Sequence, residues 1–337
     1  MAHAEYIIVY MQRIIIIYNP RSSRFSDVKK EVLDPAKGLK GCMVGKYEVE
    51  KTNLDDNIAK LSKLIKNKDL IIAAGGDATG IIASNSILKS GKDATLAVLP
   101  YGNFNDLSCT LSTKNFNDIF VSGGQDPFSE DRKLGRTALS VSEENGSGRH
   151  LGKFYPLEVI VDGKLFRYAT CYVTIGMTAE AVKLYDTPVM RRKLKSNFGR
   201  KVSSYTELAS WYFKNRHKKQ FIPEFKLNGI LQHKSTSDYA ALNGRSMARV
   251  MKGGEDFKDP KVFRSETDRL TDFWRLSKLM LKSIFFRTPG SETTKDIIEF
   301  VNPATVEIQT EGEWKKFENI KNIVIRKSKK CLKVIES

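Results

Sequence analysis

The sequence DLIIAAGGDAT, residues 69–79, predicts a buried strand that ends in a tight turn and is followed by a helix. A short apolar run without polar alternation is typical of a strand covered on both faces, as parallel strands are. Gly75 and Gly76 allow the backbone to turn sharply and to approach a ligand closely. The helix that follows presents unpaired N–H groups and the positive end of its dipole, and both favour a bound phosphate.

Similar strands flank this stretch on both sides. Ile14–Ile17 is a β-branched run before it, and Thr95–Leu99 is an apolar run after it. The segment 47–51 alternates in polarity and predicts a further strand, while apolar residues at helical spacing predict helices over 57–65 and 81–88. Strands that alternate with helices in this order predict a doubly wound α/β domain.

The pattern changes after about residue 120. A turn-rich joint over 122–127 precedes alternating segments at 137–141, 154–161 and 167–174, which predict antiparallel strands. We expect helices over 203–215 and 270–286 and final strands over 305–309, 322–325 and 331–335. The sequence therefore predicts two domains, an α/β domain made of residues 1–125 and 322–337 and a mostly antiparallel β domain made of residues 126–321.

Composition and charge limit the class of protein. Hydrophobic residues make up 41% of the 337 residues, which is enough for a real core, and no run of 18 apolar residues predicts a membrane span. The N-terminal residues lack the positive head of a secretory signal, and the four cysteines lie far apart, so we expect a reducing cytoplasm. The net charge of +17 favours an anionic partner, although a basic composition bias gives the same value.

Two further loops are expected beside the glycine turn. Asn19-Pro20-Arg21-Ser22-Ser23 follows the first strand, and Pro100–Asp106 follows the strand after the glycine turn. The carboxyl ends of parallel strands form the edge where open α/β sheets bind ligands. Taken singly, each loop is an ordinary turn, and Gly75–Thr79 is equally well a strand-to-helix turn with a capped helix and no ligand. Their joint placement favours a ligand site.

At these three loops the sequence resembles the diacylglycerol kinase catalytic domain family of soluble lipid kinases, which includes sphingosine and ceramide kinases. The family patterns are Asn-Pro-x-Ser-Gly, Gly-Gly-Asp-Gly-Thr and Pro-x-Gly-Thr-x-Asn-Asp-Phe, and they correspond here to 19–23, 75–79 and 100–107. Further similar segments follow in the family's order at 175–180, 243–244 with 253–254, 267–272 and 309–313. The resemblance spans nearly the whole chain.

The resemblance implies an ATP- and Mg2+-dependent transfer of phosphate to a lipid hydroxyl. It also implies that ATP binds between an NAD-kinase-like α/β domain and a β-sandwich domain. Glu313 would accept the proton of the lipid hydroxyl, Asp77 would take part in catalysis, and Asp268 would help to hold a magnesium ion. The ATP site would be lined by Asn19, Pro20, Arg21, Ser22, Ser23, Thr52, Gly75, Gly76, Asp77, Ala78, Thr79, Gly102 and Asn103.

The sequence departs from the family pattern at several of these positions. Ala78 replaces a glycine, and it would be strained there if the position required a positive φ. Ile82 stands where the family has Glu, Asn103 and Thr178 replace Thr and Asp, and Arg269 replaces a glycine. Two alternatives therefore stay open. One is an NAD kinase, which shares the Gly-Gly-Asp-Gly-Thr motif, and the other is a non-catalytic lipid- or nucleotide-binding protein.

A basic segment suggests where a lipid kinase would meet its substrate. Residues 183–219 contain eleven Lys or Arg and two acidic residues, and the aromatic triplet Trp211–Phe213 lies among them. Aromatic and basic residues together suit the headgroup layer of an anionic membrane. We therefore expect a cytoplasmic protein attached peripherally to the membrane. The alternative is a solvated basic helix face, and no nucleic-acid-binding module accompanies the segment. A homodimer is compatible with the resemblance, which leaves the oligomeric state open.

Overall fold

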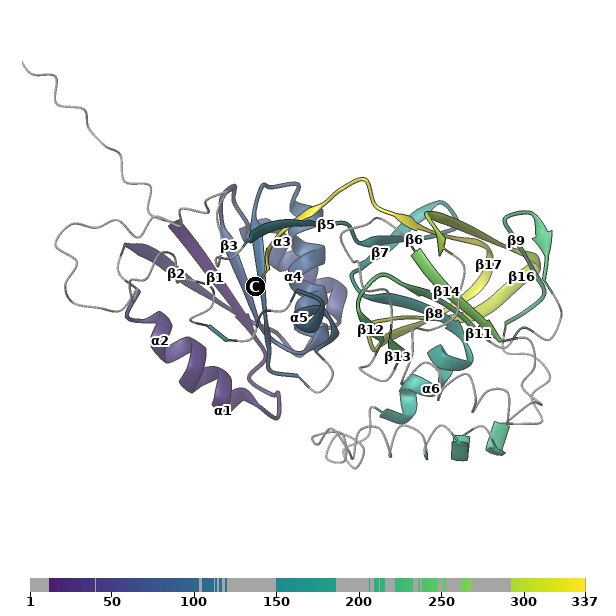
Figure 1. The fold of residues 1–337 in the computed structure, drawn as a ribbon, viewed down its shortest axis with the longest axis horizontal. Helices are drawn as coiled ribbons and strands as arrows, with labels where there is room; N and C mark the ends of the chain where they lie inside the picture. Colours follow the sequence, from purple (N-terminus) through teal and green to yellow (C-terminus); the bar gives the residue numbers. More distant parts are fainter. Residues whose placement is uncertain are drawn as a thin grey trace, which may run out of the picture.

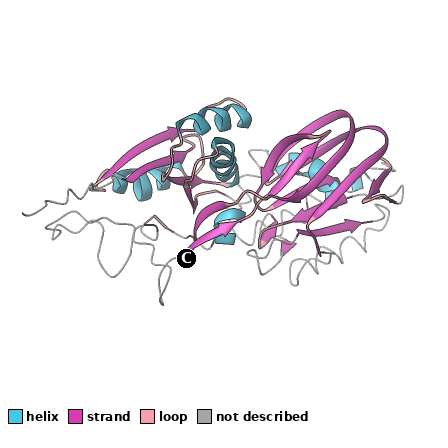
Figure 2. Cartoon of the chain, turned by 90° about the horizontal axis from the view of Figure 1, so that it is seen from above, coloured by secondary structure: helices cyan, strands magenta, loops and turns pink. Residues whose placement is uncertain are grey.

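The computed structural model arranges the chain in two lobes that lie side by side, one around each of two sheets (Figure 1, Figure 2). The described residues are 12–39, 41–102, 105–111, 113, 115–116, 119, 150–185, 206, 209–211, 213–215, 222–232, 236, 238–247, 251–252, 262–267 and 292–336. The predicted strand at 137–141 and the predicted helix at 270–286 lie outside these residues.

The first sheet has the order β2-β1-β3-β4-β18-β5. Its neighbours pair in parallel except for β5, which runs antiparallel to β18. The strands are β1 (Gln12–Tyr18), β2 (Cys42–Glu48), β3 (Leu70–Gly75), β4 (Thr95–Pro100), β5 (His150–Phe154) and β18 (Leu332–Glu336). The runs at 14–17, 69–74, 95–99 and 331–335 are confirmed as strands. The strand predicted at 47–51 lies instead at 42–48, because β2 is an edge strand whose side chains are mostly accessible and do not alternate regularly between buried and exposed.

Helices cover both faces of this sheet, as a doubly wound domain requires. Ile15 and Ile17 face α3 (Leu54–Leu64) and α4 (Asp77–Ser90), while Ile14 and Ile16 face the segment 25–36 on the other side. That segment comprises α1 (Phe25–Val28), η1 (Lys29–Leu33) and α2 (Asp34–Ala36), and α5 (Asp106–Leu111) follows β4. No helix in the described part of the chain is long and apolar enough to span a bilayer.

The second sheet is antiparallel throughout and has the order β15-β14-β11-β8-β16-β17-β6-β7. It encloses its own apolar core, as expected for a β-sandwich-like domain. Its strands are β6 (Leu157–Val161), β7 (Lys164–Ala169), β8 (Tyr172–Gly176), β11 (Asp238–Leu242), β14 (Val262–Thr267), β15 (Glu292–Thr293), β16 (Lys295–Thr310) and β17 (Glu313–Lys327). Shorter elements are α6 (Met177–Tyr185), β9 (Phe225–Leu227), β10 (Ile230–Leu231), β12 (Ser246–Met247) and β13 (Met251–Lys252).

The chain passes between the two sheets at points other than the predicted domain boundaries, 125/126 and 321/322. β5 still belongs to the first sheet, so the chain passes to the second sheet after Phe154. It returns after Lys327, because the predicted strand 322–325 is the last part of the long strand β17. Register shifts bend the β16–β17 hairpin between Glu299 and Val306, which hides its length from a pattern search.

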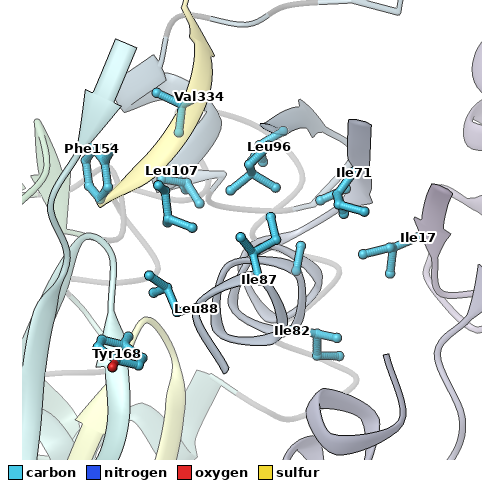
Figure 3. Close-up of a cluster of buried hydrophobic side chains, with 14 of the residues drawn as sticks. Ile17, Ile71, Ile82, Ile87, Leu88, Leu96, Leu107, Phe154, Tyr168 and Val334 are labelled. Atoms are coloured by element: carbon cyan, nitrogen blue, oxygen red, sulfur yellow. The ribbon is translucent and has the colours of Figure 1, made fainter. Parts of the chain in front are cut away.

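Besides the core that each lobe has of its own, one apolar cluster extends across both lobes. The cluster that surrounds α4 includes Ile87 and Leu88 from the first lobe and Tyr168 and Tyr172 from the second (Figure 3 shows the first three). A continuous core of this kind disfavours free rotation between the lobes, because separating them would expose apolar surface to water.

Two leucines on α3 test the packing of this core. Leu61 is completely buried, whereas Leu64 is 50% exposed on the same helix. We expect L61A to lower the free energy of unfolding by about 2–5 kcal/mol through the cavity that it leaves. L64A should change it by about 0.5 kcal/mol or less. Urea unfolding followed by circular dichroism measures both values, and equal losses would contradict this packing.

Candidate active site

The strand register of the first sheet brings the three predicted loops together. Tyr18 pairs with Ala74, and Gly75 pairs with Pro100, so the chain leaves all three strands at the same edge. Arg24 then donates through Nη1 to the Pro100 carbonyl at 3.0 Å and ties the first loop to the third. The loops that the sequence predicted as one site are therefore neighbours in space.

The second and third loops approach each other so closely that glycine is required. A Cβ on Gly102 would lie 2.3 Å from the Cα of Gly76, and one on Gly75 would lie 2.3 Å from Thr79 Oγ1. Gly76 caps α4 with extended backbone, and its carbonyl accepts from the Thr79 N–H at 3.0 Å. Ala78 lies in the first turn of α4 and is not among the residues with positive φ, so its replacement of glycine introduces no strain.

Asp77 joins these two loops. Its carboxylate accepts the backbone N–H of Asn105 at 3.1 Å and that of Asp106 at 2.8 Å, at the beginning of α5. The Asn105 side chain in turn accepts from the Gly102 N–H at 2.6 Å and donates to the Gly102 carbonyl at 2.8 Å. Asp77 thus holds the third loop in place beside the glycine turn.

The first loop is organised around Asn19. The Asn19 side chain accepts the N–H of Arg21 at 3.0 Å, and the Asn19 carbonyl accepts that of Ser22 at 3.0 Å. The Ser22 hydroxyl is buried and has no hydrogen-bond partner among the described residues. Pro20 lies in the same turn, and the Ser23 side chain is exposed. The loop therefore offers an unused hydroxyl at the sheet edge.

Thr52 lies in a neighbouring loop between β2 and α3. Arg21 donates through Nη2 to the Val49 carbonyl at 3.0 Å and connects this loop to the first one. Thr52 is exposed, and its hydroxyl accepts from Asn57 Nδ2 at 3.1 Å.

The other two predicted ligands, Asn103 and Asp268, lie outside the described residues, and their roles stay predictions.

The second lobe contributes a buried carboxylate, Glu311. It occupies the two-residue turn between β16 and β17, and both Glu311 and Gly312 have positive φ, +51° and +89°. Glu311 is 5% exposed and accepts from Thr170 Oγ1 at 2.7 Å and from the backbone N–H of Cys171. Its other oxygen, Oε2, has no hydrogen-bond partner among the described residues. These φ values are those of a two-residue type I′ hairpin turn, which places Glu311 at the end of the β16–β17 hairpin.

Glu311, Asp77 and Asp106 lie within each other's electrostatic influence. Burial raises the pKa of Glu311 to about 7, and the charge of Asp106 adds to this effect. Burial, followed by the charges of Asp106 and Glu311, raises the pKa of Asp77 to about 8. Asp106 is fully buried and accepts from Ser246 Oγ of the second lobe at 2.6 Å. Such a concentration of carboxylates with raised pKa values is typical of functional sites.

In this turn the charge of Glu311 adds to that of Asp106 in raising the pKa of Asp77, whereas the sequence predicted a role for Glu313. Glu313 is half-buried at the beginning of β17, opposite Thr310, and its predicted role stays a prediction. Both acids belong to the same Glu-Gly-Glu turn, and sequence spacing alone does not tell which of them is buried beside Thr170. Asp106 was within the quoted third loop, but nothing in the sequence distinguished it, and no pattern pointed to Thr170 or Ser246.

Two other departures from the family pattern have local explanations. Ile82 is buried in the core around α4, where a charged residue would lose its hydration. Thr178 donates through its N–H and its hydroxyl to Asp238 on β11, at 3.0 and 2.5 Å. An acid on a neighbouring strand thus lies beside the position where the family has Asp.

A substitution at Gly102 tests the close approach of the loops. G102A should lower the free energy of unfolding by about 1–3 kcal/mol, because backbone atoms of Gly76 must move to accept the new methyl group. G45A is the matched control, since a Cβ there meets nothing closer than 3.7 Å, and we expect a change within about 0.5 kcal/mol. Equal denaturation curves for the two variants would reject the tight contact.

The raised pKa of Glu311 predicts a pH-dependent stability. An acid whose pKa is higher in the folded state than in the unfolded state is stabilising below its unfolded value of 4.5, and this contribution is lost as the pH rises through about 7. The difference corresponds to about 3 kcal/mol. In metal-free buffer, wild type should therefore lose stability relative to E311Q between pH 5 and pH 8. Parallel stability curves for the two proteins would show that Glu311 is not desolvated.

Comparison with known proteins is consistent with the geometry. Residues 13–122 match the family model of the diacylglycerol kinase catalytic domain. Three crystal structures from Bacillus anthracis str. Sterne, one described as a diacylglycerol kinase and two as candidate diacylglycerol kinases, have the same fold. They are 15%, 15% and 16% identical to this chain, with TM-scores of 0.58, 0.59 and 0.57, and each alignment covers 97% of both chains. The comparison with curated proteins found no match to this sequence.

The family match covers the three loops on which the resemblance rested, from Asn19 to Leu107. The structural matches extend over the second lobe and show that the whole chain shares the two-domain fold of these proteins. Residues 13–122 accordingly match the diacylglycerol kinase catalytic domain, and the chain as a whole has the fold of the three solved structures.

Proposed function

We propose that the protein is an ATP- and Mg2+-dependent lipid kinase that transfers the γ-phosphate of ATP to the hydroxyl of a diacylglycerol-like lipid. The observation that carries the proposal is the position of Glu311. It is a buried carboxylate with an unused oxygen, brought by the second lobe to the phosphate-binding edge of the first. A kinase needs this pairing of a phosphate site with a proton acceptor for the attacking hydroxyl.

The first lobe supplies the features that a triphosphate requires. The 14-residue helix α4 begins at the Gly75–Gly76 turn, and its N-terminus favours a phosphate through free N–H groups and its dipole. Gly102 brings a second stretch of backbone against this turn without a side chain between them. The buried Ser22 hydroxyl and exposed Thr52 lie on adjoining loops and complete the proposed nucleotide site.

Glu311 is suited to accept the proton of the lipid hydroxyl. With a pKa of about 7, it is largely ionised slightly above neutral pH and is still basic enough to take a proton. In the proposed step, the hydroxyl oxygen forms a bond to the γ-phosphorus while the bond to the leaving ADP oxygen breaks. The hydroxyl proton passes to Glu311 Oε2, the atom without another partner. Thr170 and Cys171 hold Oε1 and keep the carboxylate oriented.

The site is compatible with Mg2+ delivered together with ATP. Among the described residues there is no group of three metal-ligating side chains, so a protein-only cage is not the expected arrangement. Mg2+ typically binds through one or two carboxylates and substrate phosphates, and Asp77, beside the glycine turn, suits this role. The ion would neutralise phosphate charge and polarise the transferred group. A role for Asp268 remains part of the proposal.

The location of the lipid substrate implies docking on an anionic membrane from the cytoplasmic side. Trp314 lies three residues after Glu311, is 44% exposed, and has Lys183 Nζ 4.3 Å from its ring centroid. An exposed aromatic side chain beside a lysine suits the headgroup layer. Lys183 is also the first residue of the basic segment 183–219. A homodimer at the membrane is compatible with this proposal.

The alternatives keep less support. The case for a non-catalytic relative rested partly on strain at Ala78, and that residue is unstrained. No contact among the described residues favours NAD over a lipid as the acceptor, and phosphorylation of NAD in a direct assay would revise the proposal.

The two glutamates on either side of Gly312 allow a direct test of which one accepts the proton. With radiolabelled ATP, Mg2+ and vesicles containing diacylglycerol, we expect E311Q to lower kcat by at least about 100-fold, since the amide no longer accepts a proton. E313Q, two residues away in the same turn, should retain activity within about threefold. The reverse ranking would make Glu313 the acceptor, as the sequence analysis expected. No transfer by wild type to any lipid, with ATP binding intact, would reject the kinase proposal.

A further inference from the structure

We infer that Asn85 is a positioning residue that sets Glu311 against the phosphate loops across the boundary between the two lobes. The inference rests on the proposed function, because it concerns how the proposed proton acceptor is placed. Asn85 lies in α4, the helix that begins with Asp77, and it is 4% exposed. Nothing in its position would bring it into contact with a substrate.

The Asn85 side chain pairs with the backbone of one residue in the second lobe. Its Nδ2 donates to the Tyr168 carbonyl at 2.8 Å, and its Oδ1 accepts the Tyr168 N–H at 2.9 Å. Tyr168 belongs to β7, the last strand in the order of the second sheet. The amide therefore takes the place of a neighbouring strand and satisfies two polar groups of a buried edge, which would otherwise be expensive to desolvate.

The orientation of this amide is fixed from its own helix. Nδ2 also donates to the Ile81 carbonyl one turn earlier in α4, at 3.0 Å. The donor side of the amide is thus directed to one carbonyl in each lobe, and the acceptor side is left for the Tyr168 N–H. A side chain without both a donor and an acceptor at these positions cannot reproduce the pairing.

The paired backbone leads directly to Glu311. β7 ends at Ala169, and the next two residues, Thr170 and Cys171, are the ones that hold the Glu311 carboxylate. Asn243 donates through Nδ2 to the Thr170 carbonyl at 2.7 Å, so this turn is braced within the second lobe as well. A shift of β7 relative to α4 would carry the turn, and with it Glu311, away from Asp77.

The remaining contacts between the lobes are less able to set this position. The ion pair between Arg167 and Asp55, at 2.8 Å, has a partner that is 53% exposed, and such pairs contribute little. The shared apolar core resists separation but is not directional. Ser246 fixes Asp106 at 2.6 Å but does not contact the turn that holds Glu311. Thr110 of α5 reaches the turn itself, but its contact there is a weak one, from Oγ1 to Cys171 Sγ at 4.0 Å. Asn85 is thus the contact between the lobes that pairs with two backbone groups of the strand leading into that turn.

The test compares N85D with S86A. Asp is similar in size to Asn and can still accept from the Tyr168 N–H, but it lacks the donor and places a carboxylate against two carbonyls. Ser86 is the matched control, because it is a fully buried polar residue of the same helix whose hydroxyl donates to Ile58 O at 3.2 Å, within the first lobe. Circular dichroism and gel filtration verify that both variants are folded.

We expect N85D to lower kcat about 100-fold, the effect of a misplacement of about 1 Å. Its KM for MgATP should stay within about twofold of wild type, since the nucleotide loops lie in the first lobe. S86A should change neither value by more than about twofold. Equal losses of kcat in the two variants, or a rise in KM for MgATP that accounts for the loss in N85D, would overturn the inference.

A second measurement does not depend on activity. Hydrogen exchange over residues 164–176 reports the Tyr168 N–H, bound to Asn85, and the Cys171 N–H, bound to Glu311. We expect N85D to accelerate exchange at both amides by about tenfold or more, and S86A to leave them unchanged. If wild type phosphorylates no lipid, the proposed function fails and exchange alone decides the role of Asn85. Unchanged exchange at Cys171 in N85D would reject that role.

Discussion

The mutual repulsion and desolvation of three carboxylates is the constraint around which this structure is built. Asp77 and Asp106 come from the first lobe and Glu311 from the second. The charge of Asp106 raises the pKa of both others, and the charge of Glu311 raises that of Asp77. Left without partners, such groups would be strongly unfavourable in a protein interior. The chain stabilises them with directed donors: backbone N–H groups for Asp77, the Ser246 hydroxyl for Asp106, and Thr170 with the Cys171 N–H for Glu311.

One of these donors and one further side chain bind across the boundary between the lobes, so the site and the domain arrangement depend on each other. Ser246 of the second lobe binds Asp106 of the first, and Asn85 of the first lobe binds the strand that precedes the Glu311 turn. Loss of one of these donors while the lobes stay packed would leave a buried carboxylate without that partner, which is unfavourable. Burial, together with the charge of Asp106, gives Glu311 the raised pKa that a proton acceptor needs near neutral pH. The burial of these carboxylates thus accounts both for their need of hydrogen-bond donors and for the proposed proton acceptor.

Local sequence patterns predicted the regular strands and helices of the first lobe. β-branched and apolar runs located the strands beginning at Gln12, Leu70 and Thr95, and the glycine turn marked the N-terminus of α4. The edge strand β2 and the bent β16–β17 hairpin were misplaced, because partial exposure and register shifts remove the periodicity on which such predictions rest. At Ala78 the pattern suggested strain that the helical backbone does not have.

The order of residues along the chain was sufficient to place three loops at one sheet edge, since parallel strands that alternate with helices all end on the same side. The family resemblance also pointed to the Glu-Gly-Glu turn, and its part in the site stays a prediction. The burial of Glu311 comes with its contacts to Thr170 and Cys171, which are about 140 residues away along the chain, and no local pattern predicts those contacts. Likewise, Asn85 and Ser246 acquire a role only when the second lobe packs on the first. Hydrogen bonds between distant segments depend on where folding brings them, and no local pattern encodes that position.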